Sequence, residues 1–546
     1  MDPEHSAATL DLLRQASVLL QAGHHAEAAA QLGRALDAAP GNATVSNAIE
    51  RLLAVARTWL TIGQAQQALT LLAPIAGSEH ANGTALMLYG HALMALGRKD
   101  EAEAIFRRWA GNEPHNGDAV LRLAAVLADN NTPSEAEALV RAEITRHGET
   151  PEVVFVLGRA LLGQARFDEA ETAFRKVVLA RPEHQSAQTN LMELVWMRSG
   201  DVREAARALD RALRAQPHLT GLRITKARLL VSARMPQEAL AVIDAGLEIS
   251  ARDAALLMAA STIALEFDGA RALAYAQRLL QVAPDDRAAH VEAGNASLAT
   301  GDAQAALRVA EALYRSYPTD GRALAMMADA LRMLGDQRYR DLLDYRNFVR
   351  ADWIDVPDGW SSLSAYLSDL VGDLGRLHTL HAHPIGNSLR EGSQVQLDPA
   401  RSAIASIRAF PQAIDGPIRR YMQALGTGSD PMRRRNTGRY RISGIWSVRL
   451  RPHGFHVNHY HPEGWISSAC YLDLPPAVAQ GGGEGWLKFG EPAFPTSPVL
   501  TPEYFIKPEP GLLALFPSYM WHGTVPFAGA ADERRLTIAF DVVPVD

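Results

Sequence analysis

A repeat of about 34 residues is the feature that most constrains how this chain of 546 residues can fold. In a typical copy an alanine is followed four residues later by a hydrophobic or small residue and eight residues after that by a proline, as in Ala170, Phe174 and Pro182. The marker alanines are Ala28, Ala68, Ala102, Ala136, Ala170, Ala205, Ala239, Ala272 and Ala306, separated by 40, 34, 34, 34, 35, 34, 33 and 34 residues. Small alanines allow close helix packing and the proline ends a helix, so the pattern predicts stacked helix pairs.

The period resembles that of the tetratricopeptide repeat, with one insertion near Asn42. The resemblance covers residues 1–335 and implies an all-α superhelical solenoid of about nine repeats, followed at 336–359 by a capping helix and a linker. Solenoids of this kind present a concave groove that usually binds peptides or proteins. We therefore expect a peptide or protein partner in the groove, and the alternative is a purely scaffolding role.

A second constraint is a group of histidines far from the repeats. Residues 453–461 contain four of them, and the triplet His459-Tyr460-His461 lies before a strand-like run. Side chains at positions i and i+2 of an extended strand point to the same face, so His459 and His461 can direct two imidazoles at one point. Sixty-one residues after His461, an apolar segment that begins at Leu515 turns and presents His522. This geometry is typical of a metal site.

The segment that begins at Arg535 completes the set. Its alternation places Arg535 and Thr537 on one face of a strand. Non-haem Fe(II) oxygenases hold iron through two histidines and usually a carboxylate, and leave other positions open. A fixed cation such as Arg535, with a hydroxyl beside it, can anchor the distal carboxylate of a 2-oxo acid by charge-assisted hydrogen bonds.

These motifs, in this order, resemble the bacterial and phage branch of the 2-oxoglutarate and Fe(II)-dependent oxygenases. The matching segments are His459–Pro462, Ser467–Leu472, Phe516–Ser518 with His522, Arg535–Thr537 and, upstream, Asn387–Gln394. The resemblance covers residues 360–546. It implies a double-stranded β-helix, also called a jelly roll or cupin-like fold, with buttressing helices, so that the whole chain is an α+β protein in two parts.

The same resemblance implies the cofactors and their ligands. Fe(II) is the metal, and 2-oxoglutarate and O2 are the co-substrates. His459 and His522 correspond to iron ligands, and Arg535, Thr537 and Tyr471 correspond to residues that hold 2-oxoglutarate. The expected reaction is hydroxylation of a C–H bond with release of succinate and CO2.

His461 departs from the common pattern of the wider superfamily, which is H-x-D. Three neutral histidines would leave an Fe(II) site at +2 rather than +1, which favours a dianionic co-substrate and can admit other divalent metals. Alternatively His461 turns away, and Glu463 or water completes the metal shell. Aspartyl β-hydroxylases, which also join helical repeats to such a domain, likewise lack the carboxylate.

Five further residues are candidates for substrate contact or for support of the metal ligands: Asn387, Arg390, Gln394, Asn458 and Trp521. A structural role is the alternative for each of them. With repeats attached, the expected substrate is a peptide or protein side chain. The alternatives are a repeat scaffold with a catalytically degenerate metal domain, and an oxygenase that acts on a small molecule.

Composition narrows the class of protein further. A net charge of −7 and a pI near 6.2 give no indication of nucleic-acid or acidic-membrane binding. The single cysteine, Cys470, excludes an intramolecular disulfide and fits a reducing compartment. The first residues lack the pattern of a signal peptide, and no uninterrupted apolar run approaches about 18 residues, so we expect a cytoplasmic protein without a membrane span. The oligomeric state is left open.

Periodicity predicts the elements around the histidines. Residues 360–382 and 399–425 show the apolar spacing of amphipathic helices. From Tyr440 onward the pattern is that of strands. They are expected at 440–450, 465–474, 486–489, 511–516 and 535–543.

Overall fold

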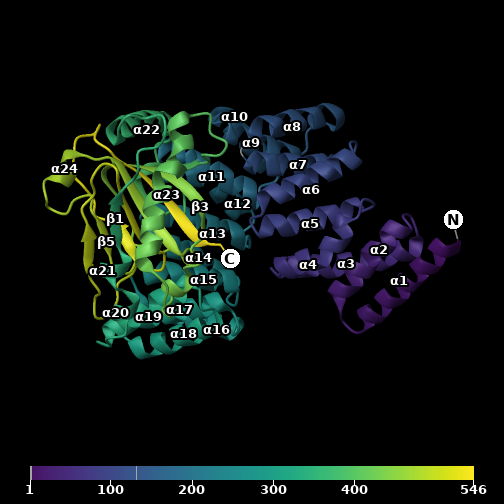
Figure 1. The fold of residues 1–546 in the computed structure, drawn as a ribbon, viewed down its shortest axis with the longest axis horizontal. Coiled ribbons are helices and arrows are strands. Elements are labelled where there is room, and N and C mark those ends of the chain that lie inside the picture. The colour runs from purple at the N-terminus through teal and green to yellow at the C-terminus, as the bar shows by residue number, and fades with distance from the viewer. Residues whose placement is uncertain (1–2, 131, 546) are drawn as a thin grey trace. The chain divides into compact units, whose positions relative to one another are not determined.

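The computed structural model describes residues 3–130 and 132–545. The chain divides into two compact units, residues 1–187 and residues 188–546. Unit 1 is helical, whereas unit 2 combines helices with two antiparallel sheets (Figure 1).

The helices of unit 1 pack as consecutive pairs, as Figure 1 shows for α5 to α8. Their bounds are α1 Pro3–Gln21, α2 His25–Ala38, α3 Ala43–Thr61, α4 Ala65–Gly77, α5 Gly83–Ala95, α6 Lys99–Asn112, α7 Gly117–Asp129, α8 Pro133–His147, α9 Pro151–Gly163 and α10 Phe167–Ala180. The marker alanines of the even-numbered helices are fully buried. In α9 and α10, an added Cβ at Gly158 would lie 2.6 Å from Phe174, so a glycine is needed where the two helices approach.

Prolines set the ends of the second helices. α2, α6 and α10 each end two residues before Pro40, Pro114 and Pro182, respectively. A proline disfavours the α conformation of the residue before it, which explains this constant offset. The first helix of several pairs begins at a side-chain cap, as at Asn116, whose Oδ1 accepts hydrogen bonds from the backbone of Asp118 and Ala119.

Unit 2 contains the remaining helix pairs and a final single helix. Their bounds are α11 Gln185–Ser199, in which the boundary between the units falls, α12 Val202–Ala215, α13 Thr220–Ser232, α14 Pro236–Leu247, α15 Ala254–Leu265, α16 Gly269–Val282, α17 Arg287–Ala299, α18 Ala303–Ser316 and α19 Gly321–Met333. The same proline offset recurs after α12, α16 and α18, and Asp253, Asp286 and Asp320 cap α15, α17 and α19.

After α19 the chain forms short helices and then two sheets. The helices are α20 Tyr339–Leu342, α21 Tyr345–Phe348, α22 Leu363–Leu377, α23 Ala405–Leu425, the 3₁₀ turn η1 Arg433–Arg435 and α24 Pro476–Ala479. The strands are β1 Arg350–Trp353, β2 Leu389–Leu397, β3 Tyr440–His456, β4 Ile466–Asp473, β5 Leu487–Phe489, β6 Tyr504–Ile506, β7 Leu512–Pro517, β8 His522–Thr524 and β9 Arg535–Pro544.

The larger sheet has the antiparallel order β1-β7-β4-β9-β3-β2, and the smaller sheet has the order β6-β5-β8. Helix α23 packs beside β1 and β7, and α22 packs beside β4. The side chains of Phe410 and Phe540 meet edge to face, with ring centroids 6.1 Å apart, which joins α23 to the sheet. The predicted fold class, a repeat solenoid followed by a double-stranded β-helix with accompanying helices, is confirmed.

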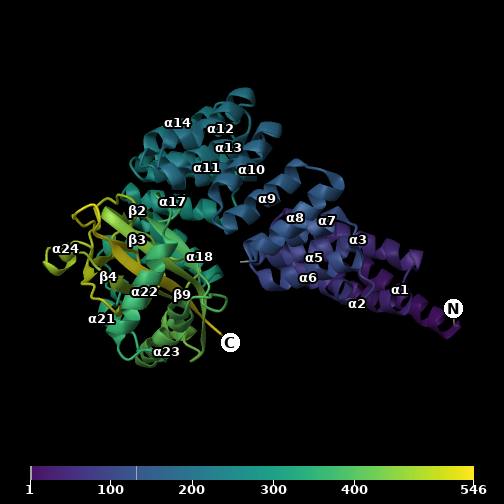
Figure 2. The same ribbon diagram turned by 90° about the horizontal axis from the view of Figure 1, so that it is seen from above.

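The helices and sheets of unit 2 share one hydrophobic core, which extends from Ala227 on α13 to Val542 on β9. Polar contacts join the same parts. Nε1 of Trp521 donates to Asp329 of α19 (2.8 Å), and the Tyr519 hydroxyl donates to the backbone oxygen of Leu342 (2.7 Å). The repeat helices of unit 2 are therefore part of the structure that supports the sheets (Figure 2).

The predicted segment 336–359 contains α20, α21 and β1, and β1 pairs with β7 at the edge of the larger sheet. The domain boundaries at 335 and 359 stay predictions. Among the described residues, no helix combines the length and apolar character needed to cross a bilayer.

The buried Asp329 predicts a pH-dependent stability. Burial raises the pKa of Asp329 to about 7, and the neighbouring Arg332 acts in the opposite direction. This lies above the usual aspartate pKa of about 3.9, so the free energy of unfolding should fall as the pH rises from about 4 to about 7. Asp329→Asn keeps an acceptor for Trp521, so we expect this variant to lose this pH dependence and to be about 4 kcal/mol more stable than wild type at pH 8.

Thermal unfolding of both proteins at pH 5 and pH 8 measures the effect. Asp341→Asn, on the exposed surface, is the matched control and should follow wild type. If the unfolding temperatures of wild type and Asp329→Asn depend on pH in the same way, the pKa of Asp329 is not raised.

Candidate metal centre and active-site chamber

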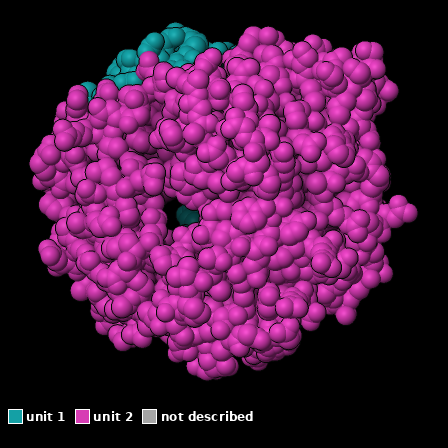
Figure 3. All heavy atoms as spheres, turned by 90° about the vertical axis from the view of Figure 1, so that its left-hand side faces the viewer, with its two compact units in different colours: residues 1–187 teal, residues 188–546 magenta. Residues whose placement is uncertain are grey.

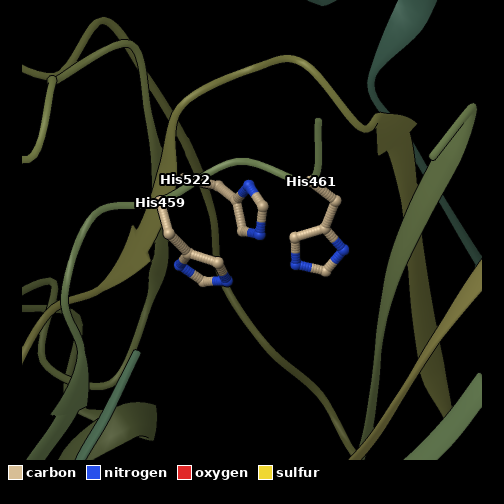
Figure 4. A group of neighbouring side chains, drawn as sticks. All are labelled: His459, His461 and His522. Atoms are coloured by element: carbon tan, nitrogen blue, oxygen red, sulfur yellow. The ribbon is translucent and has the colours of Figure 1, made fainter. Parts of the chain in front are cut away.

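Three histidines converge between the two sheets. His459 and His461 follow the end of β3, and His522 begins β8. The backbones of His459 and His522 form two reciprocal N–H···O hydrogen bonds of 2.9 Å each, and the N–H of His461 donates to the oxygen of Ser518 (2.8 Å). One ring nitrogen of each histidine points toward a common space (Figure 4), and these nitrogens lie within 4.8 Å of one another.

The other ring nitrogen of each histidine is held by an acceptor. Nδ1 of His459 lies 2.9 Å from the oxygen of Val457, and Nδ1 of His522 lies 2.9 Å from the oxygen of Met520. Carbonyl oxygens only accept hydrogen bonds, so Nδ1 donates and Nε2 keeps its lone pair. This arrangement is typical of histidines that bind metal through Nε2.

Burial keeps two of these rings neutral. It lowers the pKa of His459 to about 3, and the nearby His461 ring acts in the same direction. Burial also lowers the pKa of His522 well below its usual value. A neutral imidazole is the form that binds metal, so the pair is ready to act as ligands at physiological pH.

The third ring is held by a carboxylate. Nδ1 of His461 lies 2.6 and 2.7 Å from the two carboxylate oxygens of Asp541, and the Ser467 hydroxyl donates to Asp541 (2.8 Å). A carboxylate behind a metal-binding histidine orients the ring and makes it a stronger ligand. The side chain of Glu463, the alternative ligand, is 87% exposed and lies 3.9 Å from Arg322, outside the histidine cluster.

Asp541 was missed in the sequence. It lies six residues after Arg535 on β9, and the period of two along a strand places Arg535, Thr537, Ala539 and Asp541 on one face. All four line the same cavity. The alternation that identified Arg535 and Thr537 therefore also carried the signal for Asp541.

Arg535 and Tyr471 form the other end of this arrangement. Arg535 is 2% exposed, and its guanidinium lies 5.2 Å from the centre of the Tyr471 ring. Its Nε donates to the oxygen of Gly485 (3.1 Å), and no carboxylate of the described chain forms an ion pair with it. The buried Tyr471 hydroxyl has no hydrogen-bond partner either. A buried cation without a carboxylate partner and a buried hydroxyl without an acceptor, among the described residues, match an anionic ligand.

Burial lowers the pKa of the Arg535 guanidinium, although an arginine stays protonated at any physiological pH. The charge is therefore held in place where a carboxylate can reach it. Thr537, two residues along the same face, is also buried.

A cavity of about 950 Å3 contains these groups. Its lining includes the three histidines, Arg535, Thr537 and, among the further candidates, Asn387, Arg390 and Gln394. Tyr471 is not one of the lining residues, although its ring centre lies 5.2 Å from the Arg535 guanidinium. The other two candidates lie outside the lining: Nδ2 of Asn458 donates to Glu491 (2.9 Å), and Trp521 donates to Asp329 and packs against Tyr460.

The contact between Asp541 and His461 predicts a change in metal affinity. Asp541→Asn removes the negative charge behind the ring, so we expect Mn(II) to bind about tenfold more weakly, or more weakly still. Calorimetric titration of the metal-free protein with Mn(II) measures this. Asp532→Asn, an exposed substitution outside the cavity, should bind like wild type. Equal affinity of the Asp541 variant and wild type would contradict a role for this carboxylate.

Comparison with known proteins agrees with the two parts of the chain. Residues 444–541 match the family model described as "Putative 2OG-Fe(II) oxygenase". One tetratricopeptide repeat model matches residues 13–49, 53–116, 90–151, 155–219 and 268–321, and another matches residues 197–263. No curated protein matched the chain.

Solved structures of repeat proteins are similar to parts of it. A tetratricopeptide repeat protein from Parabacteroides merdae ATCC 43184 is 15% identical over 45% of this chain and 97% of its own, with a TM-score of 0.31. MamA from Desulfovibrio magneticus RS-1 is 23% identical over 31% and 96%, with a TM-score of 0.26. Yeast Tom70 is 14% identical over 62% and 77%, with a TM-score of 0.36. The chain thus joins tetratricopeptide repeats to a domain that matches the 2OG-Fe(II) oxygenase family.

Proposed function

We propose that the chamber of unit 2 is the active site of an Fe(II)- and 2-oxoglutarate-dependent dioxygenase that hydroxylates a peptide or protein side chain. One observation carries the proposal: three inward-facing histidine nitrogens and a buried, unpaired arginine line the same cavity. The first group suits a metal and the second suits the free carboxylate of a 2-oxo acid.

His459, His461 and His522 would hold Fe(II) as neutral ligands. The usual two-histidine site includes a carboxylate that directly binds the iron. Here the carboxylate of Asp541 contacts Nδ1 of His461 instead of the metal. It would place a negative charge close to the metal without occupying a ligand position. Bound Fe(II) with 2-oxoglutarate would supply the chemistry that uses O2 to hydroxylate a C–H bond.

Arg535, Thr537 and Tyr471 would bind the distal carboxylate of 2-oxoglutarate. The guanidinium forms charge-assisted hydrogen bonds, and the two hydroxyls can donate to the remaining oxygen lone pairs. Because Arg535 is held by Gly485 and by the Tyr471 ring, little motion is needed when the ligand arrives. The apolar Phe516 packs edge to face against the His522 ring, with centroids 4.7 Å apart, and excludes water from that side.

The cytoplasm remains the proposed location, because one buried cysteine, Cys470, fits a reducing compartment. The oligomeric state is outside this proposal.

Succinate formation by the iron-loaded protein, supplied with 2-oxoglutarate and O2, tests the activity. We expect His522→Ala to abolish turnover because a metal ligand is lost. Arg535→Ala should weaken 2-oxoglutarate binding about 100-fold, since a buried charged hydrogen-bond partner is removed. Arg534→Ala is the matched control, because Arg534 is exposed and pairs with Asp473 on the surface (2.8 Å).

Wild type that binds neither Fe(II) nor 2-oxoglutarate would exclude the enzyme and leave a repeat scaffold. If turnover survives Arg535→Ala but is lost in Arg534→Ala, then Arg534 and not Arg535 binds 2-oxoglutarate.

Tyr471→Phe separates binding from stability. Without ligand, the buried Tyr471 hydroxyl lacks a partner, so its removal should stabilise the free protein by about 1 kcal/mol. The same change should weaken 2-oxoglutarate binding about tenfold. Thermal unfolding without ligand and 2-oxoglutarate titration with Mn(II) present measure the two effects.

Tyr366→Phe is the matched control, because the buried Tyr366 hydroxyl donates to the oxygen of Ser406 (3.0 Å). It should destabilise the protein and leave 2-oxoglutarate affinity unchanged. An unchanged affinity in Tyr471→Phe would exclude this hydroxyl from the site.

A further inference from the structure

Two repeat helices of unit 2 line the same cavity as the histidines. The lining residues are Ile224, Ala227, Arg228, Val231 and Ser232 on α13, and Ala255, Met258, Ala259, Thr262, Ile263 and Glu266 on α15 or immediately after it. Intervals of three and four residues place side chains on one face of a helix. One face of each helix is therefore turned toward the metal centre.

This face is not filled by the packing of the repeats. Ala255, Thr262 and Glu266 are exposed, and Val231 and Met258 are only half-buried, although all five belong to or follow helices whose other faces form the core. The space-filling view shows a small opening near the centre of the magenta face, which is formed by residues 188–546 (Figure 3). The two helices thus present side chains to a space that a ligand can enter.

The chamber is larger than the co-substrate requires. Cavities of about 300–1,000 Å3 hold drug-sized ligands, and this one has a volume of about 950 Å3. Space therefore remains for a segment of several residues beside 2-oxoglutarate. Asn387, Ser388 and Gln394 line the same space and can form hydrogen bonds with the peptide groups of an extended chain.

The repeat wall carries both apolar and charged side chains. Val231, Met258 and Ala259 supply apolar surface, whereas Arg228 and Glu266 carry opposite charges. Among residues 188–545, neither Arg228 nor Glu266 forms an ion pair within 4.0 Å. At longer range Arg228 interacts with Glu193, and Glu266 interacts with Arg390. Two charges of opposite sign on one wall, neither held in a close ion pair, are complementary to a ligand that carries both charges.

We propose that α13 and α15 form the substrate-facing wall of the active site, and that the substrate is an extended peptide with an apolar side chain opposite the metal. An acidic residue of this peptide faces Arg228, and a basic residue on the other side faces Glu266. This rests on the proposed function and specifies its substrate. For each C–H bond hydroxylated, one atom of O2 enters that bond and the other enters succinate, while 2-oxoglutarate loses CO2.

The first experiment measures binding of fluorescent heptapeptide pools, each with one fixed central residue and random flanks. Binding is followed by fluorescence anisotropy under argon with Mn(II) and 2-oxoglutarate, so that no turnover occurs. We expect pools with a central Leu, Ile, Val or Met to bind at least tenfold more tightly than pools with a central Asp or Lys. Absence of binding by every pool, or preference for a charged centre, would overturn the proposal and favour a small-molecule substrate.

The second experiment reverses the charges of the wall. Two peptides share a central Leu and differ only in whether Asp precedes and Lys follows it, or the reverse. Wild type should prefer one order about tenfold, and the double variant Arg228→Glu with Glu266→Arg should prefer the other. The matched control is Arg252→Glu with Glu248→Arg, an exposed pair between α14 and α15 and outside the cavity lining.

The outcomes distinguish this inference from the proposed function. Both double variants should keep the wild-type affinity for Mn(II) and 2-oxoglutarate and the wild-type unfolding temperature. If the charge-reversed variant prefers the same peptide order as wild type, the inference is wrong. Normal 2-oxoglutarate binding in that case leaves the proposed enzyme function intact. A different result would separate the two proposals the other way. If wild type does not bind 2-oxoglutarate, but the preferred order of Asp and Lys still reverses in the Arg228→Glu, Glu266→Arg variant, the proposed function is wrong and the peptide-binding wall is supported.

Discussion

The pair of backbone hydrogen bonds between His459 and His522 is the interaction on which the candidate site depends. His459 follows β3 of the larger sheet, whereas His522 begins β8 of the smaller one. Their reciprocal 2.9 Å bonds join the two sheets and fix the spacing of the two rings, whose centroids lie 4.2 Å apart. His461 then needs only the two-residue alternation of an extended chain to face the same point.

Charge balance explains the combination of neutral histidines, one carboxylate and one arginine around this site. A buried guanidinium close to three protonated imidazoles would form an uncompensated positive region, which is costly. Neutral histidines reduce that cost, and Asp541 provides one negative charge beside His461. Arg535 remains without a carboxylate partner in the described chain, so the arrangement favours a ligand that brings negative charge with it.

The sequence predicted most of this architecture because its signals are local. In the repeats, the same two signals recur many times: a proline two residues beyond the second helix, and a buried marker alanine where helices pack closely. Long strands such as β4 and β9 show clear alternation of side chains. Strands β1, β2, β6 and β8 were not predicted. β1, β6 and β8 have only three or four residues, whereas β2 has nine and its sequence, Leu389–Leu397, shows no regular alternation of apolar and polar residues. Asp541 was missed because its role depends on the position of His461, eighty residues away.

The wall formed by α13 and α15 could not be predicted either, because it lies even further in sequence from the histidines that it faces. Met258 and His459 are about two hundred residues apart, and nothing local indicates that they face one cavity. Their proximity arises because α13 to α19 and the sheets share one apolar core, so the repeat helices cannot leave without exposing the surface that supports the metal centre. A repeat solenoid that only recruits a substrate can be attached by a flexible linker. Fusion through the core instead places α13 and α15 beside the cavity that the three histidines line, as the proposed peptide wall requires.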